Sequence, residues 1–189
     1  MPAIIPICQV DVPCADAETA TNNAASILVG TNMPESQCTA PATAAITDAI
    51  VLTAFQDVPL PEATLTIQPP DARTLVNLDT NFYTVAEPFT TSVTLLGSQV
   101  DLDISPASYT WSFGDGTVRS TTTPGAAYPD LLVTHAYEST GTVATSVTVT
   151  WGARYRVDGG PWADVAGTVD MTSPSVDLEV IEATPVLTD

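Results

Sequence analysis

From residue 62 onward, hydrophobic and polar residues alternate in short runs, which is the period expected of half-buried β-strands. The clearest run covers residues 99–104, where apolar residues alternate with Asp101 and Asp103. Successive side chains of a strand point to opposite faces, so this run predicts one apolar face and one acidic face. Further alternating or β-branched runs lie at residues 65–67, 74–79, 81–85, 90–96, 140–149, 151–157, 168–171 and 175–181. Short strands at this spacing, separated by Gly, Pro and Asp, predict an all-β sandwich.

Residues 43–56 form the one segment with a helical pattern. A stripe along one helix face is approximated by Ile46, Ala49, Ile50 and Phe55. Thr43 is a plausible N-cap, and Pro59 and Pro61 end the pattern. We therefore expect one short helix before the strands begin.

The dipeptide Gly97-Ser98 separates the runs at 90–96 and 99–104. A type II′ turn requires a positive φ at the first of its two loop residues, and glycine adopts that conformation readily. The sequence therefore predicts a two-residue hairpin whose loop is Gly97 and Ser98.

The most specific motif combines aromatic residues with glycines. Residues 109–117 read Tyr-Thr-Trp-Ser-Phe-Gly-Asp-Gly-Thr, residues 133–137 read Val-Thr-His-Ala-Tyr, and a strand of β-branched residues follows at 140–149. Trp111 and Phe113 alternate on one strand, so both are expected to point inward. The order W-x-F-G-D-G, H-x-Y and a glycine-led strand closely resembles the polycystic kidney disease (PKD) domain, an immunoglobulin-like β-sandwich found mostly outside cells. The resemblance implies a module that spaces, docks or binds, without enzymatic activity.

The resemblance places the motif-bearing part at about residues 87–150, with further strands on both sides. Residues 62–187 are also similar to uncharacterised secreted actinobacterial proteins that contain this domain, a resemblance that carries no known activity. We therefore expect an immunoglobulin/PKD-like β-sandwich with additional C-terminal strands, one short N-terminal helix and an extended N-terminal arm. The predicted boundaries are an arm with cysteines at 1–42, a helix and linker at 43–61, and the sandwich with its C-terminal extension at 62–189.

The charge of the chain excludes some partners. Twenty-two acidic residues stand against four basic ones, with no lysine, and the net charge is −18. Binding to nucleic acid requires a basic surface that displaces phosphate counterions, so we expect no nucleic-acid partner. The charge also disfavours anionic membranes, and no run reaches the roughly 18 apolar residues of a membrane span. Because only 14% of residues are charged, much of the surface carries hydroxyls and amides, which suits an extracellular or cell-surface location.

The predicted arm holds all three cysteines, Cys8, Cys14 and Cys38. An odd number leaves one thiol over if two pair, and the pairing stays open: a local disulfide, a bridge between chains, or a metal site. Zinc is disfavoured because there is no Cys-x-x-Cys pair and the single histidine, His135, lies far along the chain. A disulfide is the favoured interpretation, and we expect no metal or other cofactor.

Two apolar islands of the arm, residues 3–8 and 24–29, suggest a second role. Such a segment can add a strand to an open sheet edge of a neighbouring copy, or fold back and cover the edge of its own domain. The first residues lack the basic region of a secretory leader, and prolines interrupt their apolar run. We therefore expect either a mature form that has lost a leader or a protein that leaves the cell without one, such as a virion protein.

His135 and Asp115 are the residues of the motif that could take part in catalysis or metal binding. His135 is the only ordinary general base near neutral pH, but no nucleophile motif accompanies it, and packing beside Tyr137 is the favoured role. Asp115 stands between two glycines, as a hairpin turn requires. Some PKD domains bind calcium through nearby carboxylates, but the family usually has Asp where this chain has Ser112, which weakens that assignment.

The remaining candidates are surface carboxylates and tryptophans. The other acidic residues considered for calcium or glycoside hydrolysis are Asp101, Asp103, Asp158, Asp170, Asp177 and Glu179. None of them belongs to a local loop with six to eight oxygens, so a solvated acidic face is favoured over a calcium site. One of Trp151 and Trp162 can be exposed and stack on a sugar, although packing in the core is favoured for both. We assign no catalytic, cofactor-binding or metal residues.

Together these observations predict a non-enzymatic structural or adhesive module at an extracellular or cell surface. It would act by protein–protein contact or by self-assembly into a filament or surface layer. The expected partners are copies of itself through the arm, or other surface proteins, with a polysaccharide as a further option. Two alternatives stay open: a virion decoration or tail protein, and a carbohydrate- or calcium-dependent binding module.

Overall fold

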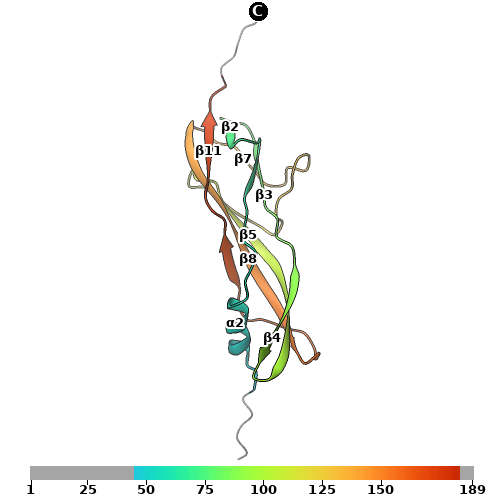
Figure 1. The fold of residues 1–189 in the computed structure, drawn as a ribbon. Coiled ribbons are helices and arrows are strands. Elements are labelled where there is room, and N and C mark those ends of the chain that lie inside the picture. Colours follow the sequence, from blue (N-terminus) through green and yellow to red (C-terminus); the bar gives the residue numbers. More distant parts are fainter. Residues whose placement is uncertain (1–44, 184–189) are drawn as a thin grey trace, which may run out of the picture. The chain divides into compact units, whose positions relative to one another are not determined.

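The structure of the chain is a computed structural model that describes residues 45–183, and β-strands are its main regular element (Figure 1). One helix, α2 (Asp48–Gln56), precedes the strands. The strands are β1 (Thr66–Gln68), β2 (Arg73–Leu75), β3 (Thr80–Tyr83), β4 (Phe89–Leu95), β5 (Ser98–Ser112), β6 (Val118–Thr121), β7 (Thr134–His135), β8 (Gly141–Val157), β9 (Ala163–Asp164), β10 (Val169–Thr172) and β11 (Val176–Ile181). The all-β prediction is confirmed. The predicted arm at 1–42, with Cys8, Cys14 and Cys38, lies outside the described residues.

The two longest strands, β5 and β8, pair antiparallel and form the centre of the larger sheet. Its strand order is β2-β11-β8-β5-β4, while β6 joins β5, and β9 and β10 join β8. A smaller sheet has the order β1-β3-β7. Figure 1 shows β5 and β8 side by side, with α2 near the end of the sheet that holds the β4–β5 hairpin.

Strand β5 is continuous where the sequence pattern indicated two separate strands. Pairing with β8 runs from Val100 to Ser112, with an irregularity between Pro106 and Ser108 that inserts one extra residue. The buried positions are even-numbered before this bulge, ending at Ile104, and odd-numbered after it, beginning at Tyr109. A bulge shifts the alternation by one residue, so both halves of the strand face the same core. The change of phase made one strand look like two.

Strand β8 is also longer than predicted. The pattern indicated a break near residue 150, yet the pairing with β5 continues through Trp151 and Gly152 to Val157. Trp151 keeps the odd-numbered inward phase of Val147 and Val149, and all three are buried. Because the alternation is not interrupted there, β8 contributes buried side chains to the core on both sides of residue 150.

Helix α2 begins later than predicted, at Asp48, with Thr47 as its N-cap residue in place of Thr43. Its fully buried side chains are Val51 and Phe55, four residues apart on one face, and the predicted stripe residue Ala49 is exposed. Only one member of the predicted stripe, Phe55, is therefore fully buried. The hydroxyl of Tyr155 in β8 donates to Asp48 Oδ1 at 2.8 Å, which ties the first helical turn to the sheet.

The β4–β5 hairpin is confirmed, but its turn differs from the prediction. Leu95 pairs with Ser98, so the two loop residues are Leu96 and Gly97. Their φ angles are +52° and +86°. Positive φ at both loop residues is the requirement of a type I′ turn, whereas type II′ needs it only at the first. The tertiary register thus placed the leucine in a conformation that glycine or asparagine prefers.

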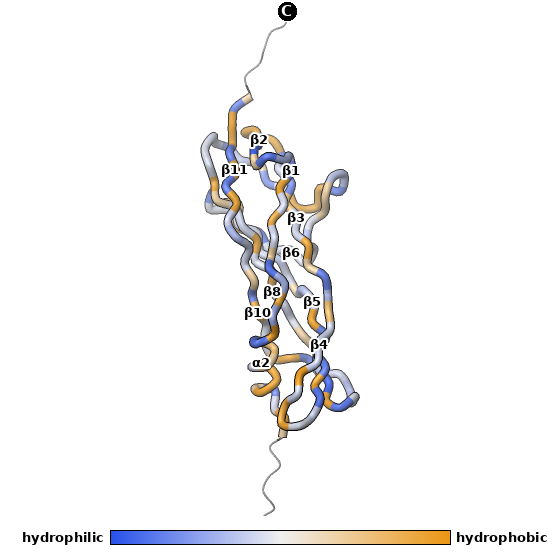
Figure 2. The backbone as a smooth tube through the Cα atoms, viewed as in Figure 1, coloured by the Kyte–Doolittle hydropathy of each residue, from blue (hydrophilic) through white to orange (hydrophobic). Residues whose placement is uncertain are grey.

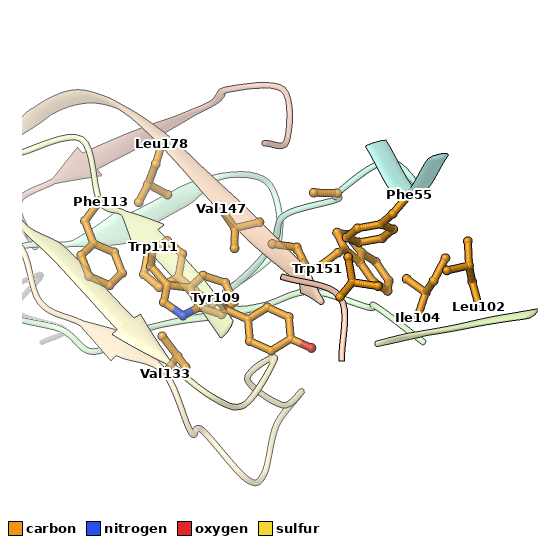
Figure 3. Close-up of a cluster of buried hydrophobic side chains, with 14 of the residues drawn as sticks. Phe55, Leu102, Ile104, Tyr109, Trp111, Phe113, Val133, Val147, Trp151 and Leu178 are labelled. Carbon is orange, nitrogen blue, oxygen red and sulfur yellow. The ribbon is translucent and has the colours of Figure 1, made fainter. Parts of the chain in front are cut away.

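The core lies along the inner faces of β5 and β8 (Figure 3). The predicted inward positions Trp111 and Phe113 are each only 1% exposed. The apolar face predicted for residues 99–104 is also confirmed, because Leu102 and Ile104 are fully buried. Figure 3 shows Trp151 and Phe55 at the same end of this cluster, and Figure 2 shows hydropathy alternating along the strands.

Candidate functional site

The Gly-Asp-Gly turn after β5 is joined to the H-x-Y segment by one short contact. Asp115 Oδ1 accepts a hydrogen bond from the Thr117 backbone N–H at 2.9 Å, and Asp115 Oδ2 lies 2.6 Å from His135 Nε2. The imidazole stacks on the Phe113 ring, with centroids 4.3 Å apart and planes inclined by 8°. Tyr137 meets the imidazole edge-on and donates its hydroxyl to the Phe113 carbonyl at 3.0 Å. The packing role predicted for His135 beside Tyr137 is confirmed.

Ionisation in this cluster favours a fixed negative charge on Asp115. Burial raises the pKa of the Asp115 carboxyl, but hydrogen bonds from His135 and Thr117 lower it by more, so that it lies below its usual value. Burial, followed by the nearby Asp115 charge, raises the pKa of Tyr137. These polar groups hold the turn in place, which is a structural task. The sequence pattern singled out His135 and Asp115 separately but missed that they touch.

The acidic face predicted on β5 is neutralised by arginines of β8. The register places Asp101 opposite Arg156 and Asp103 opposite Arg154, and each pair forms an ion pair. The Asp101 carboxyl accepts hydrogen bonds from Gln99, Ser92 and Arg156, which lower its pKa to about 2. The prediction of a solvated acidic face did not include these two ion pairs. The ion pairs arise from the antiparallel register of β5 and β8, which joins residues more than fifty positions apart in sequence.

Trp162 lies over the same arginines. The guanidinium carbons of Arg156 and Arg154 are 4.8 and 5.5 Å from the indole centroid, and the side chain is 40% exposed. Trp151 is instead buried. One of these two tryptophans is thus exposed, and its ring already lies against two cations. A pair of exposed tryptophans that could stack on a sugar is not found among residues 45–183.

Metal-binding clusters and membrane-spanning helices are both missing from the described part of the chain. Within it, no three His, Cys, Asp or Glu side chains are grouped so that they could hold a metal ion. No helix in residues 45–183 is long and apolar enough to cross a membrane.

Three exposed large apolar side chains lie close together in sequence on the loop between β6 and β7, residues 122–133, which we call the β6–β7 loop. Tyr128 is 75% exposed, Leu132 is 52% exposed and Leu131 is 43% exposed. Exposed leucines occur singly on most proteins, but an aromatic residue with two leucines within five positions is a concentrated apolar surface. The sequence pattern did not single out this loop, although its Tyr-Pro-Asp-Leu-Leu segment was a visible signal.

Two amide side chains, the buried Asn81 and the half-buried Gln68, hold the backbone of the β6–β7 loop. Asn81 is 1% exposed, and its Nδ2 donates to the Ala126 carbonyl at 2.8 Å and to Gln68 Oε1 at 3.0 Å. The same Gln68 oxygen accepts the backbone N–H of Tyr128 at 2.9 Å. A further bond of 2.8 Å joins the Thr84 N–H to the Pro124 carbonyl. The loop therefore presents apolar side chains from a backbone that is already fixed to β1 and β3.

Glycine is needed where this loop approaches β3. At Gly125, with φ of +75°, a Cβ atom would collide with the Phe82 carbonyl and lie 2.9 Å from the Tyr83 Cα. The close approach brings the loop backbone directly onto the strand. Together with the amide contacts, it makes the β6–β7 loop the best-supported candidate site for contact with another protein.

Comparison with known proteins identifies one family. Residues 79–153 match the family model described as the PKD domain. This range contains the Gly-Asp-Gly turn, the H-x-Y segment and the whole β6–β7 loop, and it confirms the predicted resemblance. PKD domains are non-catalytic β-sandwich modules of extracellular or surface proteins. A search of curated proteins found no match.

Proposed function

We propose that this chain, in which residues 79–153 form a PKD domain, is a non-enzymatic structural or adhesive module that acts at an extracellular surface by contact with other proteins. The observation that carries the proposal is the β6–β7 loop, where exposed apolar side chains project from a fixed backbone. Binding through a preorganised loop loses little conformational entropy, so most of the contact energy appears as affinity. Tyrosine in particular is enriched at the centres of protein interfaces.

The available energy is enough for a specific contact. Complete burial of a large apolar side chain is worth about 1.5–3 kcal/mol. Scaled by the exposed fractions of Tyr128, Leu131 and Leu132, the three side chains together offer about 2.5–5 kcal/mol on being covered. That is the size of a hot-spot cluster, which supports a place for the loop at the centre of the proposed interface.

Charge narrows the class of partner. With a net charge of −18, the chain repels other strongly acidic proteins, so a neutral or basic protein surface is favoured. A second copy is favoured only where the touching surfaces are uncharged. Self-assembly through residues 1–42 belongs to the same proposal, and it can be tested separately by comparing full-length protein with a truncated chain that begins at Thr43.

Site-directed photocrosslinking captures a partner of any identity, so it tests the proposal directly. Tyr128→benzoylphenylalanine places the reactive group on the loop, and Asp177→benzoylphenylalanine places it at an exposed position of β11 as a control. On the cells that produce the protein, we expect discrete crosslinked species of higher mass from position 128 only. The double change Leu131→Ser and Leu132→Ser should suppress them while thermal unfolding stays close to that of the parent.

Identical crosslinks from positions 128 and 177, or no protein crosslink from position 128, would show that the loop is not a contact surface. Mass spectrometry of the crosslinked species then states whether the partner is another protein or a second copy.

A further inference from the structure

Strand β4 is an open edge of the larger sheet. It ends the order β2-β11-β8-β5-β4, and within residues 45–183 no strand pairs with its outer side. Its sequence, Phe-Thr-Thr-Ser-Val-Thr-Leu, contains neither a charged residue nor a proline over seven positions. Natural sheets usually protect an edge with a charge, a proline, a bulge or a very short strand, because an open edge is a template for pairing.

The other edge strands of this sheet carry that protection. β6 contains Arg119, β10 contains Asp170, and β2 has only three residues, one of them Arg73. β9 has two residues. β4 is therefore the longest edge strand and differs from the other edges in both length and charge.

The hairpin geometry shows which backbone groups of β4 face outward. Leu95 and Ser98 flank a two-residue loop and so form a hydrogen-bonded pair, and hydrogen-bonded and non-hydrogen-bonded pairs then alternate along the ladder. Thr90, Ser92 and Thr94 therefore turn their N–H and C=O groups away from β5. Gln99, the partner of Thr94, confirms this phase, because its carbonyl accepts the Asp158 N–H at 2.8 Å on the opposite side.

We infer that β4 pairs antiparallel with β4 of a second copy of this chain, so that the larger sheet continues across a twofold axis at Ser92. In this register Ser92 faces Ser92 and Thr90 faces Thr94, which brings outward backbone groups against outward backbone groups. The exposed side chains on this face are hydroxyls, which form favourable cross-strand pairs. On the other face, Phe89 lies opposite Leu95 of the second copy, and both are half-buried in the single chain.

Charge explains why this edge suits a second copy. A twofold axis sets each residue near its own equivalent, so a charged edge such as β6 or β10 would oppose like charges. β4 is uncharged, and the nearest carboxylate on β5, Asp101, is already paired with Arg156. Association through β4 therefore brings no like charges of the edge strand into direct contact.

This surface is separate from the β6–β7 loop. The end of β4 at Leu95 pairs with Ser98, the first residue of β5. The β6–β7 loop is held by β3, whose Phe82 contacts Phe113, just beyond the last residue of β5. A strand of fifteen residues spans about 45 Å. The inference therefore goes beyond the proposed function, and failure of either one leaves the other standing.

Cysteine crosslinking tests the register in the full-length chain. In a hydrogen-bonded antiparallel pair the Cα atoms are about 5.5 Å apart, within reach of a disulfide. Ser92→Cys should therefore crosslink with itself on mild oxidation. Thr90→Cys should not, because its equivalent lies roughly 13 Å away along the strand. A mixture of Thr90→Cys and Thr94→Cys should crosslink, and peptide mapping separates these bonds from any made by Cys8, Cys14 or Cys38.

A proline substitution provides a second readout. Ser92→Pro removes an N–H that the β4–β5 ladder does not use, so the fold should persist. The dimer should weaken by about tenfold or more in sedimentation equilibrium, because both N–H groups at the axis are lost. Crosslinking of Ser92→Cys to the native cysteines would identify the N-terminal segment as the occupant and overturn the inference. So would equal self-crosslinking of Thr90→Cys, or a full-length protein that stays monomeric up to about 1 mM.

Discussion

The two glycines of the Gly-Asp-Gly turn allow a matched test of how closely the end of β5 packs on β8. Gly114 and Gly116 have similar φ angles, +83° and +94°, so an alanine at either position meets the same kind of backbone strain. Their surroundings differ. A Cβ atom at Gly114 would lie 2.6 Å from the Ala144 carbonyl oxygen and 2.7 Å from its nitrogen, whereas at Gly116 nothing lies within 4 Å.

The magnitudes follow from these distances. A left-handed conformation costs an L-residue about 1–2 kcal/mol, which is the expected loss of unfolding free energy for Gly116→Ala. Gly114→Ala adds a collision with backbone atoms of β8, which β11 holds on its other side opposite Ala144. Overpacking of this kind costs about 1–3 kcal/mol, so the total for Gly114→Ala is about 2–5 kcal/mol.

Urea denaturation of the two variants and the parent, followed by tryptophan fluorescence, measures the difference directly. We expect Gly114→Ala to be less stable than Gly116→Ala by about 1–3 kcal/mol, with a melting temperature roughly 2–12 °C lower. Equal losses would mean that the turn does not lie against Ala144. A larger loss for Gly116→Ala would refute the packing described for this end of the sheet.

Three further predictions concern the sheet surface. Leu96→Asn should raise the unfolding free energy by about 1 kcal/mol in urea denaturation, because asparagine tolerates the positive φ of this type I′ turn; a lower stability would contradict the turn assignment. Asp101→Asn should flatten the loss of stability between about pH 4 and pH 2. The folded pKa of Asp101 is held at about 2, below its unfolded value, so the ionised carboxylate stabilises the fold above this pH window and the stabilisation is lost as the pH falls. The control is Asp177→Asn at an exposed position. An unchanged slope of stability against pH for Asp101→Asn would count against the hydrogen-bond network around this carboxylate. Trp162→Ala should lower stability by about 1 kcal/mol, since the ring contacts two guanidinium groups, and Trp162→Phe should retain part of it; equal losses would exclude a contribution from the ring.

Local patterns in the sequence were enough to predict the fold class and the inward faces. The alternation around Leu102 and Ile104 and the aromatic pair Trp111 and Phe113 depend only on the two-residue period of a strand, which any strand in a half-buried sheet obeys. The motif residues likewise predicted the packing of His135, and the PKD resemblance followed from their order. Each of these inferences concerns residues that are neighbours in sequence.

The candidate contact surface was outside the reach of such reasoning. Its bracing groups, Gln68 and Asn81, are separated from the loop atoms that they hold by 60 and 45 residues. Nothing in the local composition of the β6–β7 loop distinguishes a loop with a fixed backbone from a solvated one. Only the tertiary structure shows that side chains of β1 and β3 fix the backbone of this loop.

What the sequence by itself determined is the existence of short alternating strands, the buried aromatic face and the hairpin position between β4 and β5. Only the tertiary structure decided that β5 passes through Pro106 with a change of phase, that Leu96 enters the turn, and that Asp101 and Asp103 meet arginines. The physical reason is that alternation is a property of one strand, whereas register is a relation between two. Register is set by the packing of both faces at once, so the partners of a side chain emerge only when the strands are assembled.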